Sequence, residues 1–268
     1  MKKKNNLPIL IIIPHGGCKV PEELSGYEAV TKFDLFMQSD TCANDLFSFG
    51  DRAAATINAT VSRLFIDLDR PYTALPPAPD GVIKKSSLDG NPVFRDGLFP
   101  DEIAIANMLQ RYWFPFHDAA KNIIGIGGIR LILECHTMMA VGPKISRDPG
   151  KPRPIALLEH LTQSKGVRQK TCDAGLIQSL GEHLKKALSD EEDTIAEKCI
   201  VSDEPSGGYI LENFGSGPVP MIRISISRSI FLNETYFNSD YLRVDELRIR
   251  HLRETLWHAI ERFFKKNL

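Results

Sequence analysis

Short apolar runs that end at polar residues predict the strands of an α/β sheet. Residues 9–13 are all aliphatic with His15 close behind, while residues 129–133 are aliphatic except for one arginine and lead into Glu134 and His136. Runs of this length and composition are typical of strands buried on both faces. Because ligands of open α/β sheets sit beyond the carboxyl ends of the strands, we expect these polar side chains to lie where a site would be built.

Periodic patterns elsewhere predict helices and further strands. The predicted strands are 61–68, 154–158 and 219–226, and the predicted helices are 34–49, 103–113 with Asp101 as N-cap, 172–188 and 252–264. Residues 72–100 contain five prolines and three glycines without a sustained apolar period, which predicts a long irregular loop. Loops of this length are uncommon unless they have a function, such as covering a site.

Composition and charge narrow the class of protein. The chain has 268 residues with 33 basic and 34 acidic side chains, and this net charge of −1 removes the electrostatic reason for nucleic-acid binding. Five cysteines without a CxxC pair fit a reduced cytoplasmic protein, and Cys135 would face away from its neighbours Glu134 and His136 as a small buried residue. The apolar part of residues 7–13 is too short for a signal peptide, and no run approaches the roughly 20 apolar residues of a membrane span. We therefore expect a cytoplasmic protein without a membrane partner.

The two strand-end histidines indicate a metal site. Neutral imidazole is a preferred zinc ligand, so His15 and His136 meeting at one sheet edge would supply two ligands. The alternative is that each histidine caps its strand and hydrogen-bonds a loop. Asp40, within the acidic predicted helix, is a candidate for a third ligand, although an aspartate on a surface helix is otherwise simply solvated.

Arg70 follows the predicted strand 61–68 in the segment Asp67 to Pro71. A guanidinium at the end of a strand is suited to bidentate capture of a substrate carboxylate, which lysine would do less well. The alternative is an ion pair with Asp67 or Asp69 that orders the turn before the proline.

Four segments, taken in order, resemble the N-formylglutamate amidohydrolase family. They are residues 14–21, 66–71, 134–138, and 207–210 ahead of 222–229, with minor agreement from the aromatic-Pro-aromatic-His pattern at 112–117. The resemblance implies a phosphorylase/hydrolase-like fold related to zinc carboxypeptidases. The expected architecture is therefore α/β, with a central mixed, largely parallel sheet flanked by helices in one domain over residues 1–268.

The resemblance also implies roles for particular residues. His15, Asp40 and His136 would bind one zinc ion. Arg70 would hold a substrate carboxylate, and Arg228 occupies a second basic position of the family motif. Asp69, which stands where asparagine is typical of the family, and His117, from the aromatic-Pro-aromatic-His segment, complete the expected substrate-binding set.

The sequence departs from the family pattern at the expected general base. Ser225 stands where the family has a catalytic glutamate, and Ser227 stands where it has asparagine. A positioned acid/base is worth on the order of 10²–10⁴ in rate, so its loss would leave a slow enzyme or none. Glu134 or Glu212 could replace it, but Glu134, two residues before His136, is better explained as a partner that orients that histidine.

The sequence therefore predicts a zinc-dependent amidohydrolase that removes a small acyl group, such as formyl, from an acidic amino acid such as N-formylglutamate. The expected partner is this small-molecule substrate. The alternative is an impaired or altered-substrate family member that binds a carboxylate ligand, because Ser225 replaces the base.

Overall fold

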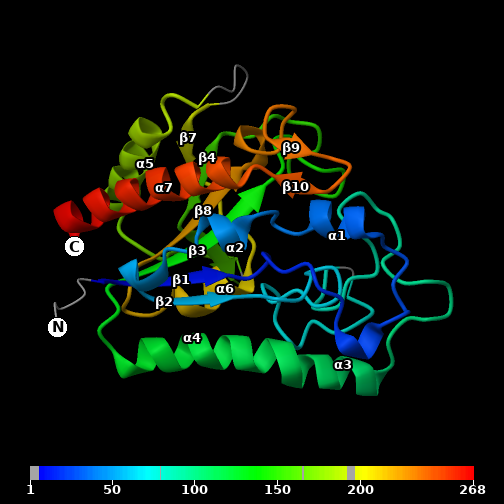
Figure 1. Ribbon diagram of the computed structural model, residues 1–268. Coiled ribbons are helices and arrows are strands. Elements are labelled where there is room, and N and C mark those ends of the chain that lie inside the picture. The colour runs from blue at the N-terminus through cyan, green and yellow to red at the C-terminus, as the bar shows by residue number, and fades with distance from the viewer. Residues whose placement is uncertain (1–5, 79, 165, 192–196) are drawn as a thin grey trace.

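A six-stranded sheet lies at the centre of the structure (Figure 1). The structure is a computed structural model that describes residues 6–78, 80–164, 166–191 and 197–268. The lysines that precede the first strand lie outside the described residues. In sheet order the strands are β2 (Ala53–Asn58), β1 (Leu7–Ile13), β3 (Leu131–Met138), β8 (Met221–Ser227), β4 (Ala156–Glu159) and β7 (Cys199–Val201). All neighbouring pairs are parallel except β8 with β4. The predicted α/β fold with a mixed, largely parallel sheet is confirmed.

Helices cover both faces of this sheet (Figure 1). One face carries α2 (Ala43–Leu46), α5 (Ala174–Ala187) and α7 (Glu246–Asn267), and the other carries α3 (Glu102–Met108), the π-helical turn η3 (Leu109–Trp113), α4 (Phe114–Ile126) and α6 (Tyr209–Phe214). Alternate residues of the strands face the two layers: Ile11 and Cys135 point to the first and Ile12 to the second. The predicted helices at 172–188 and 252–264 are confirmed, as is the cap of α3 by Asp101.

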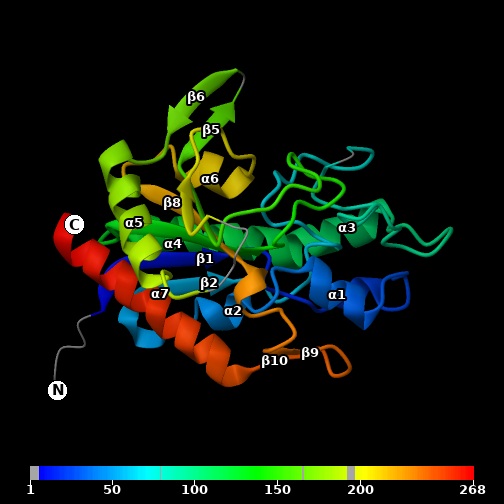
Figure 2. The same cartoon turned by 90° about the horizontal axis from the view of Figure 1, so that it is seen from above.

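Smaller elements complete the described structure. They are η1 (Glu22–Leu24), α1 (Lys32–Gln38), η2 (Gly50–Arg52), η4 (Arg228–Ile230) and two two-stranded ribbons, β5 (Leu161–Ser164) with β6 (Val167–Lys170) and β9 (Phe237–Asn238) with β10 (Arg243–Val244). Figure 2 shows the β5–β6 ribbon projecting from the body of the molecule beside α6. No helix among the described residues is long and apolar enough to span a membrane.

Two predicted elements are wrong. The predicted helix at 34–49 is two short helices, α1 and α2, because the chain turns between them: Asp40 donates its backbone N–H to the carbonyl of His15, and Cys42 has a left-handed φ of 60°. The predicted strand at 61–68 consists of turns, and its apolar side chains pack into the core beneath the sheet instead of adding to the sheet edge.

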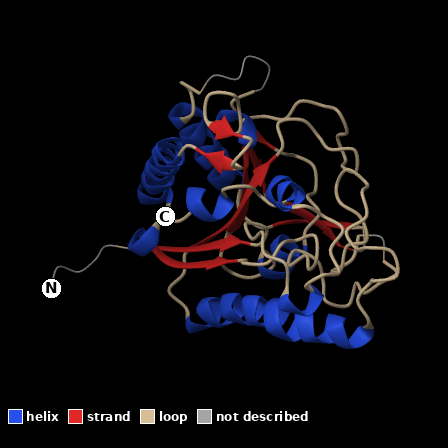
Figure 3. Cartoon of the chain, turned by 45° about the vertical axis from the view of Figure 1, so that its right-hand side comes forward, coloured by secondary structure: helices blue, strands red, loops and turns tan. Residues whose placement is uncertain are grey.

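The long irregular loop is confirmed. The described residues between 72 and 100 contain no helix or strand. Loops gather on the side to which β1, β2 and β3 point (Figure 3). On this side the second face of the sheet changes from apolar to polar, because Glu134 and His136 follow Ile132 on β3, and Arg223 and Ser225 follow Met221 on β8.

Candidate metal centre and the cavity around it

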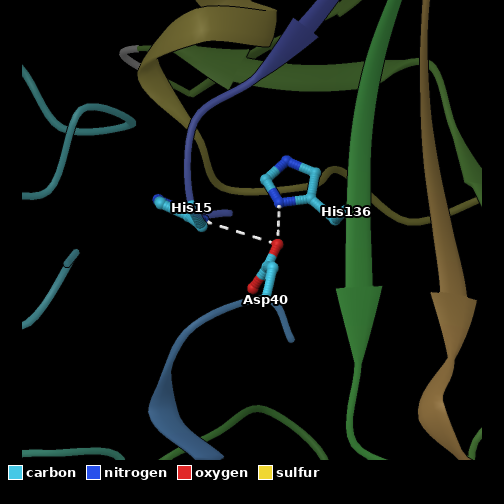
Figure 4. A group of neighbouring side chains, drawn as sticks. All are labelled: His15, Asp40 and His136. Atoms are coloured by element: carbon cyan, nitrogen blue, oxygen red, sulfur yellow. Dashed lines mark hydrogen bonds and ion pairs between the residues drawn. The ribbon is translucent and has the colours of Figure 1, made fainter. Parts of the chain in front are cut away.

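Three buried side chains from distant parts of the chain meet near the carboxyl ends of β1 and β3. His15 follows β1, His136 lies on β3, and Asp40 lies in the turn between α1 and α2 (Figure 4). Asp40 Oδ2 is 2.7 Å from His136 Nδ1 and 3.9 Å from His15 Nδ1. Their candidate ligand atoms all lie within 4.8 Å of one another, a spacing that one metal ion can bridge.

The other nitrogen of each imidazole is held by a buried carboxylate. His15 Nε2–H donates to Asp67 Oδ1 at 2.7 Å, and His136 Nε2–H donates to Glu134 Oε1 at 2.9 Å. Histidines that bind metals usually donate their second ring N–H in this way, which fixes the tautomer and the ring orientation. His15 Nδ1 is buried without a hydrogen-bond partner. Two imidazole nitrogens and one carboxylate oxygen therefore converge as a donor set that fits a divalent cation such as zinc.

Charge in this cluster is balanced by a proton when no cation is bound. Burial lowers the pKa of His136, but its hydrogen bonds with Asp40 and Glu134 outweigh burial and raise the pKa to about 9. Burial lowers the pKa of His15 to about 4, so that ring is neutral at pH 7. Burial alone would raise the pKa of Asp40, yet the hydrogen bond and charge of His136 hold it well below its usual range. A cation would take the place of the His136 Nδ1 proton.

A second group of potential metal ligands, Asp69, Glu134 and His136, lies behind the first. Here a guanidinium, and not a metal ion, supplies the positive charge that faces the carboxylates. Arg223 Nη2 donates to Glu134 Oε1 at 2.8 Å and to Asp69 Oδ2 at 2.9 Å, and all three side chains are buried. The remaining oxygen of Asp69 accepts the backbone N–H of Ile210 at the start of α6. Burial raises the pKa of Asp69 to about 6, against the opposing effect of Arg223. Because Arg223 already neutralises these carboxylates, the metal candidate is the His15, Asp40 and His136 group.

A cavity of about 220 Å³ opens over the triad and is rich in arginine. It adjoins a larger outer cavity of about 730 Å³, and the two share Arg63, Arg70, Leu88 and Gly207. The guanidinium side chains that line the inner cavity are Arg63, Arg70, Arg153, Arg223 and Arg228. A chain with a net charge of −1 therefore concentrates positive charge at this place, which suits an anionic ligand.

Arg70 and Arg228, the two expected substrate anchors, both line the inner cavity but differ in how firmly they are held. Arg70 donates from Nη2 to Asp80 Oδ2 at 2.7 Å and from Nη1 to the carbonyl of Asp69 at 2.8 Å. Its main carboxylate partner is thus Asp80, in the long loop. Arg228 is buried and donates to the carbonyls of Met37 and Ser39, so its guanidinium fixes the turn that carries Asp40.

The other expected site residues occupy different places. Ser225 lines the inner cavity and pairs with His136 across β3 and β8. Glu134 is fully buried behind His136 and is not among the residues that line the cavity, whereas Asp69 is. His117 was expected to bind substrate, but the structure places it outside the cavity. It stacks on Trp113 with ring centroids 3.9 Å apart and hydrogen-bonds the carbonyl of Leu68 through Nε2 at 2.9 Å.

Three charged residues of the site carry no distinctive sequence motif. Arg63 donates to Asp67 at 3.2 Å, Arg223 bridges Asp69 and Glu134, and Glu159 lines the inner cavity from β4. Arg223 could be noticed in the sequence as the lone charge within an otherwise uncharged strand. Arg63 and Glu159 resemble ordinary surface charges in the sequence.

Comparisons with known proteins agree on one family. The profile of the N-formylglutamate amidohydrolase family matches residues 7–232. One curated relative is the N-formylglutamate deformylase of Pseudomonas aeruginosa, which is 28% identical over an alignment that covers 53% of this chain and 56% of that protein. Another is the N-formylglutamate deformylase of Pseudomonas putida, which is 29% identical over an alignment that covers 44% of this chain and 46% of that protein. The chain therefore spans about half the length of the curated relatives it matches.

Two solved structures share the fold. The N-formylglutamate amidohydrolase of Ralstonia eutropha JMP134 superposes with a TM-score of 0.73 at 18% identity, covering 98% of this chain and 96% of that one. A gene product of Agrobacterium tumefaciens superposes with a TM-score of 0.60 at 16% identity, covering 98% of each chain. At these identities the likeness shows the architecture alone.

Proposed function

Because the chain belongs to the N-formylglutamate amidohydrolase family, we propose that it hydrolyses the amide bond of an N-acylated acidic amino acid, with N-formylglutamate as the first candidate. The observation that carries the proposal is the pairing of a metal-ligand triad with an arginine-lined cavity. The two curated relatives bear the name of this activity.

We propose zinc as the ion, held by Nδ1 of His15, Nδ1 of His136 and a carboxylate oxygen of Asp40. A divalent cation in such a site supplies Lewis acidity, which polarises a carbonyl and lowers the pKa of water. Asp67 and Glu134 have a positioning role, because each fixes one imidazole through Nε2.

The substrate carboxylates would be bound by arginines of the inner cavity. Arg70 suits this role because its present partner, Asp80, has a side chain that is 68% exposed, so a substrate carboxylate can take its place on the guanidinium. Arg153 also lines the cavity, but both oxygens of Asp148 already pair with it at 2.7 Å. Arg228 is fixed to backbone carbonyls, and its contribution is to hold Asp40 in place.

Formate release from N-formyl-L-glutamate, measured beside N-formyl-L-leucine, tests the proposed function. We expect turnover of the acidic substrate, a strong preference for it over the leucine derivative, and loss of turnover with a chelator. Arg70→Ala should raise KM for N-formylglutamate with unchanged metal content, since an interaction with the substrate carboxylate is removed. Zinc binding without formate release from any acylated amino acid would contradict the proposal, and metal loss in Arg70→Ala would show that this arginine is structural.

A further inference from the structure

The inner cavity offers few candidates for the acid/base that Ser225 does not supply. Among the described residues its carboxylates are Asp40, Asp69 and Glu159. Asp40 belongs to the metal triad, and both oxygens of Asp69 are occupied, one by Arg223 and one by the Ile210 N–H. No hydrogen bond or ion pair joins the side chain of Glu159 to any described residue, and this side chain is half-buried at the cavity wall.

Strand pairing places Glu159 on the same face as the site. β4 runs antiparallel to β8, with Glu159 opposite Arg223 and Leu157 opposite Ser225. Residues that face each other across an antiparallel pair point to the same side, so Glu159 is the diagonal neighbour of Ser225. Long side chains reach diagonal neighbours. Ser225 and Glu159 both line the inner cavity, so the carboxylate of Glu159 borders the same space as the small side chain of Ser225.

Glu159 is not needed as a counterion. The guanidinium of Arg223 already faces two buried carboxylates, Asp69 and Glu134, and also donates to the carbonyl of Gly207 at 2.7 Å. Glu159 adds an attraction to Arg223 that raises the pKa of this guanidinium less than Glu134 and Asp69 do. A carboxylate whose side chain forms no hydrogen bond, in a polar cavity next to a metal-ligand triad, has the properties expected of a general base.

We propose that Glu159 is the catalytic acid/base of this chain and replaces, from the neighbouring strand, the glutamate expected at Ser225. The proposal rests on the proposed amide hydrolysis. The Glu159 carboxylate accepts one proton from the attacking water as the new C–O bond forms. It returns that proton to the amide nitrogen as the C–N bond breaks. The second proton of the water is lost from the new carboxylic acid to the released amine, so the products are a carboxylate and an ammonium group and Glu159 is ionised again.

A crossed pair of substitutions tests this role. Glu159→Gln should lower kcat for N-formylglutamate by roughly 10²–10⁴-fold and change KM little, because a proton-transfer group acts in the transition state rather than in substrate binding. Zinc content and calorimetric binding of L-glutamate should stay at wild-type values. In the double variant Ser225→Glu with Glu159→Gln, a carboxylate returns to the family position and kcat should recover. Glu182→Gln, on the exposed face of α5, is the matched control and should retain full activity.

Each outcome separates this proposal from the proposed function. Full activity of Glu159→Gln would overturn the role of Glu159 while leaving the hydrolase intact. Loss of zinc or of glutamate binding in that variant, without rescue by Ser225→Glu, would show that Glu159 has only a structural role. An inactive wild type that becomes active with Ser225→Glu alone would also refute the Glu159 proposal, whereas inactivity of all variants would refute the proposed function itself.

Discussion

At the scale of single residues, the two ring nitrogens of each site histidine have different tasks. Nε2 is held by a buried carboxylate, which leaves Nδ1 of both rings directed towards Asp40. His15 and His136 were predicted from their positions after apolar runs. Their carboxylate partners were harder to predict, because Asp67 looked like a partner for Arg70 and only the folded chain brings it to His15.

Asp67→Asn should weaken metal binding although Asp67 itself is not a proposed ligand. Asparagine keeps the size of the side chain but removes the charge that fixes His15, and loss of such a partner typically costs 10–100-fold in metal affinity. Zinc affinity is measured by competition with a chromophoric chelator, with the exposed Asp240→Asn as control. Equal affinities in wild type, Asp67→Asn and Asp240→Asn would show that the Asp67 contact does not serve the metal site.

Three buried histidines predict a maximum in the stability of the metal-free protein. Between about pH 4 and 6.5 the unfolded state binds protons that folded His15 and His117 do not, and these two groups outweigh the opposite effect of Asp69, whose pKa is raised to about 6, so stability rises with pH. Between about pH 6.5 and 9 folded His136 holds a proton that the unfolded state has lost, so stability falls as pH rises. Urea unfolding of the chelator-treated protein across this range measures both limbs. A stability that keeps rising from pH 7 to 9 would exclude a protonated His136.

At the scale of elements, the buried strands, two of the long helices and the long loop were predictable, whereas the edge strand β2 and the turn that carries Asp40 were not. A short, unbroken aliphatic run such as residues 9–13 is typical of a strand that is buried on both faces. The edge strand β2 is half exposed and contains three alanines, so its sequence is less apolar than that of residues 61–68. Residues 61–68 form turns, but their apolar side chains are buried, which gave them the appearance of a strand. Asp40 was predicted on a helix, yet its ligand position depends on the break between α1 and α2, where its backbone N–H donates to the carbonyl of His15.

Gly208, at the N-terminus of α6, is a test of how tightly the elements pack around Arg223. A Cβ at this position would overlap Nη2 of Arg223 and lie 2.5 Å from Oδ2 of Asp69. Gly208→Ala should therefore displace the buried ion pairs, lower the melting temperature and reduce activity. The control is Gly125→Ala in α4, where nothing lies within 4 Å of the added carbon, and which should raise stability by up to about 1 kcal/mol. An unchanged melting temperature for Gly208→Ala would mean that Arg223 can move without cost.

At the scale of the whole molecule, the site is assembled from segments that are far apart in sequence. The triad joins residues 15, 40 and 136, and the cavity adds five arginines, at positions 63, 70, 153, 223 and 228. A net charge of −1 gives no sign of this local concentration of positive charge, so composition could not reveal an anion site. The expectation of an anionic substrate came instead from the order of motifs along the chain, which predicted the family to which the chain belongs.

The central claim is that His15, Asp40 and His136 form a metal site, and elemental analysis tests it most directly. Wild type and the exposed-site control His258→Ala, purified without chelator and reconstituted with zinc, should each hold about one ion per chain. His136→Ala and Asp40→Ala should lose it while keeping their secondary structure. A wild type that takes up no metal under reconstitution, or triad variants that keep a full complement of zinc, would contradict the account.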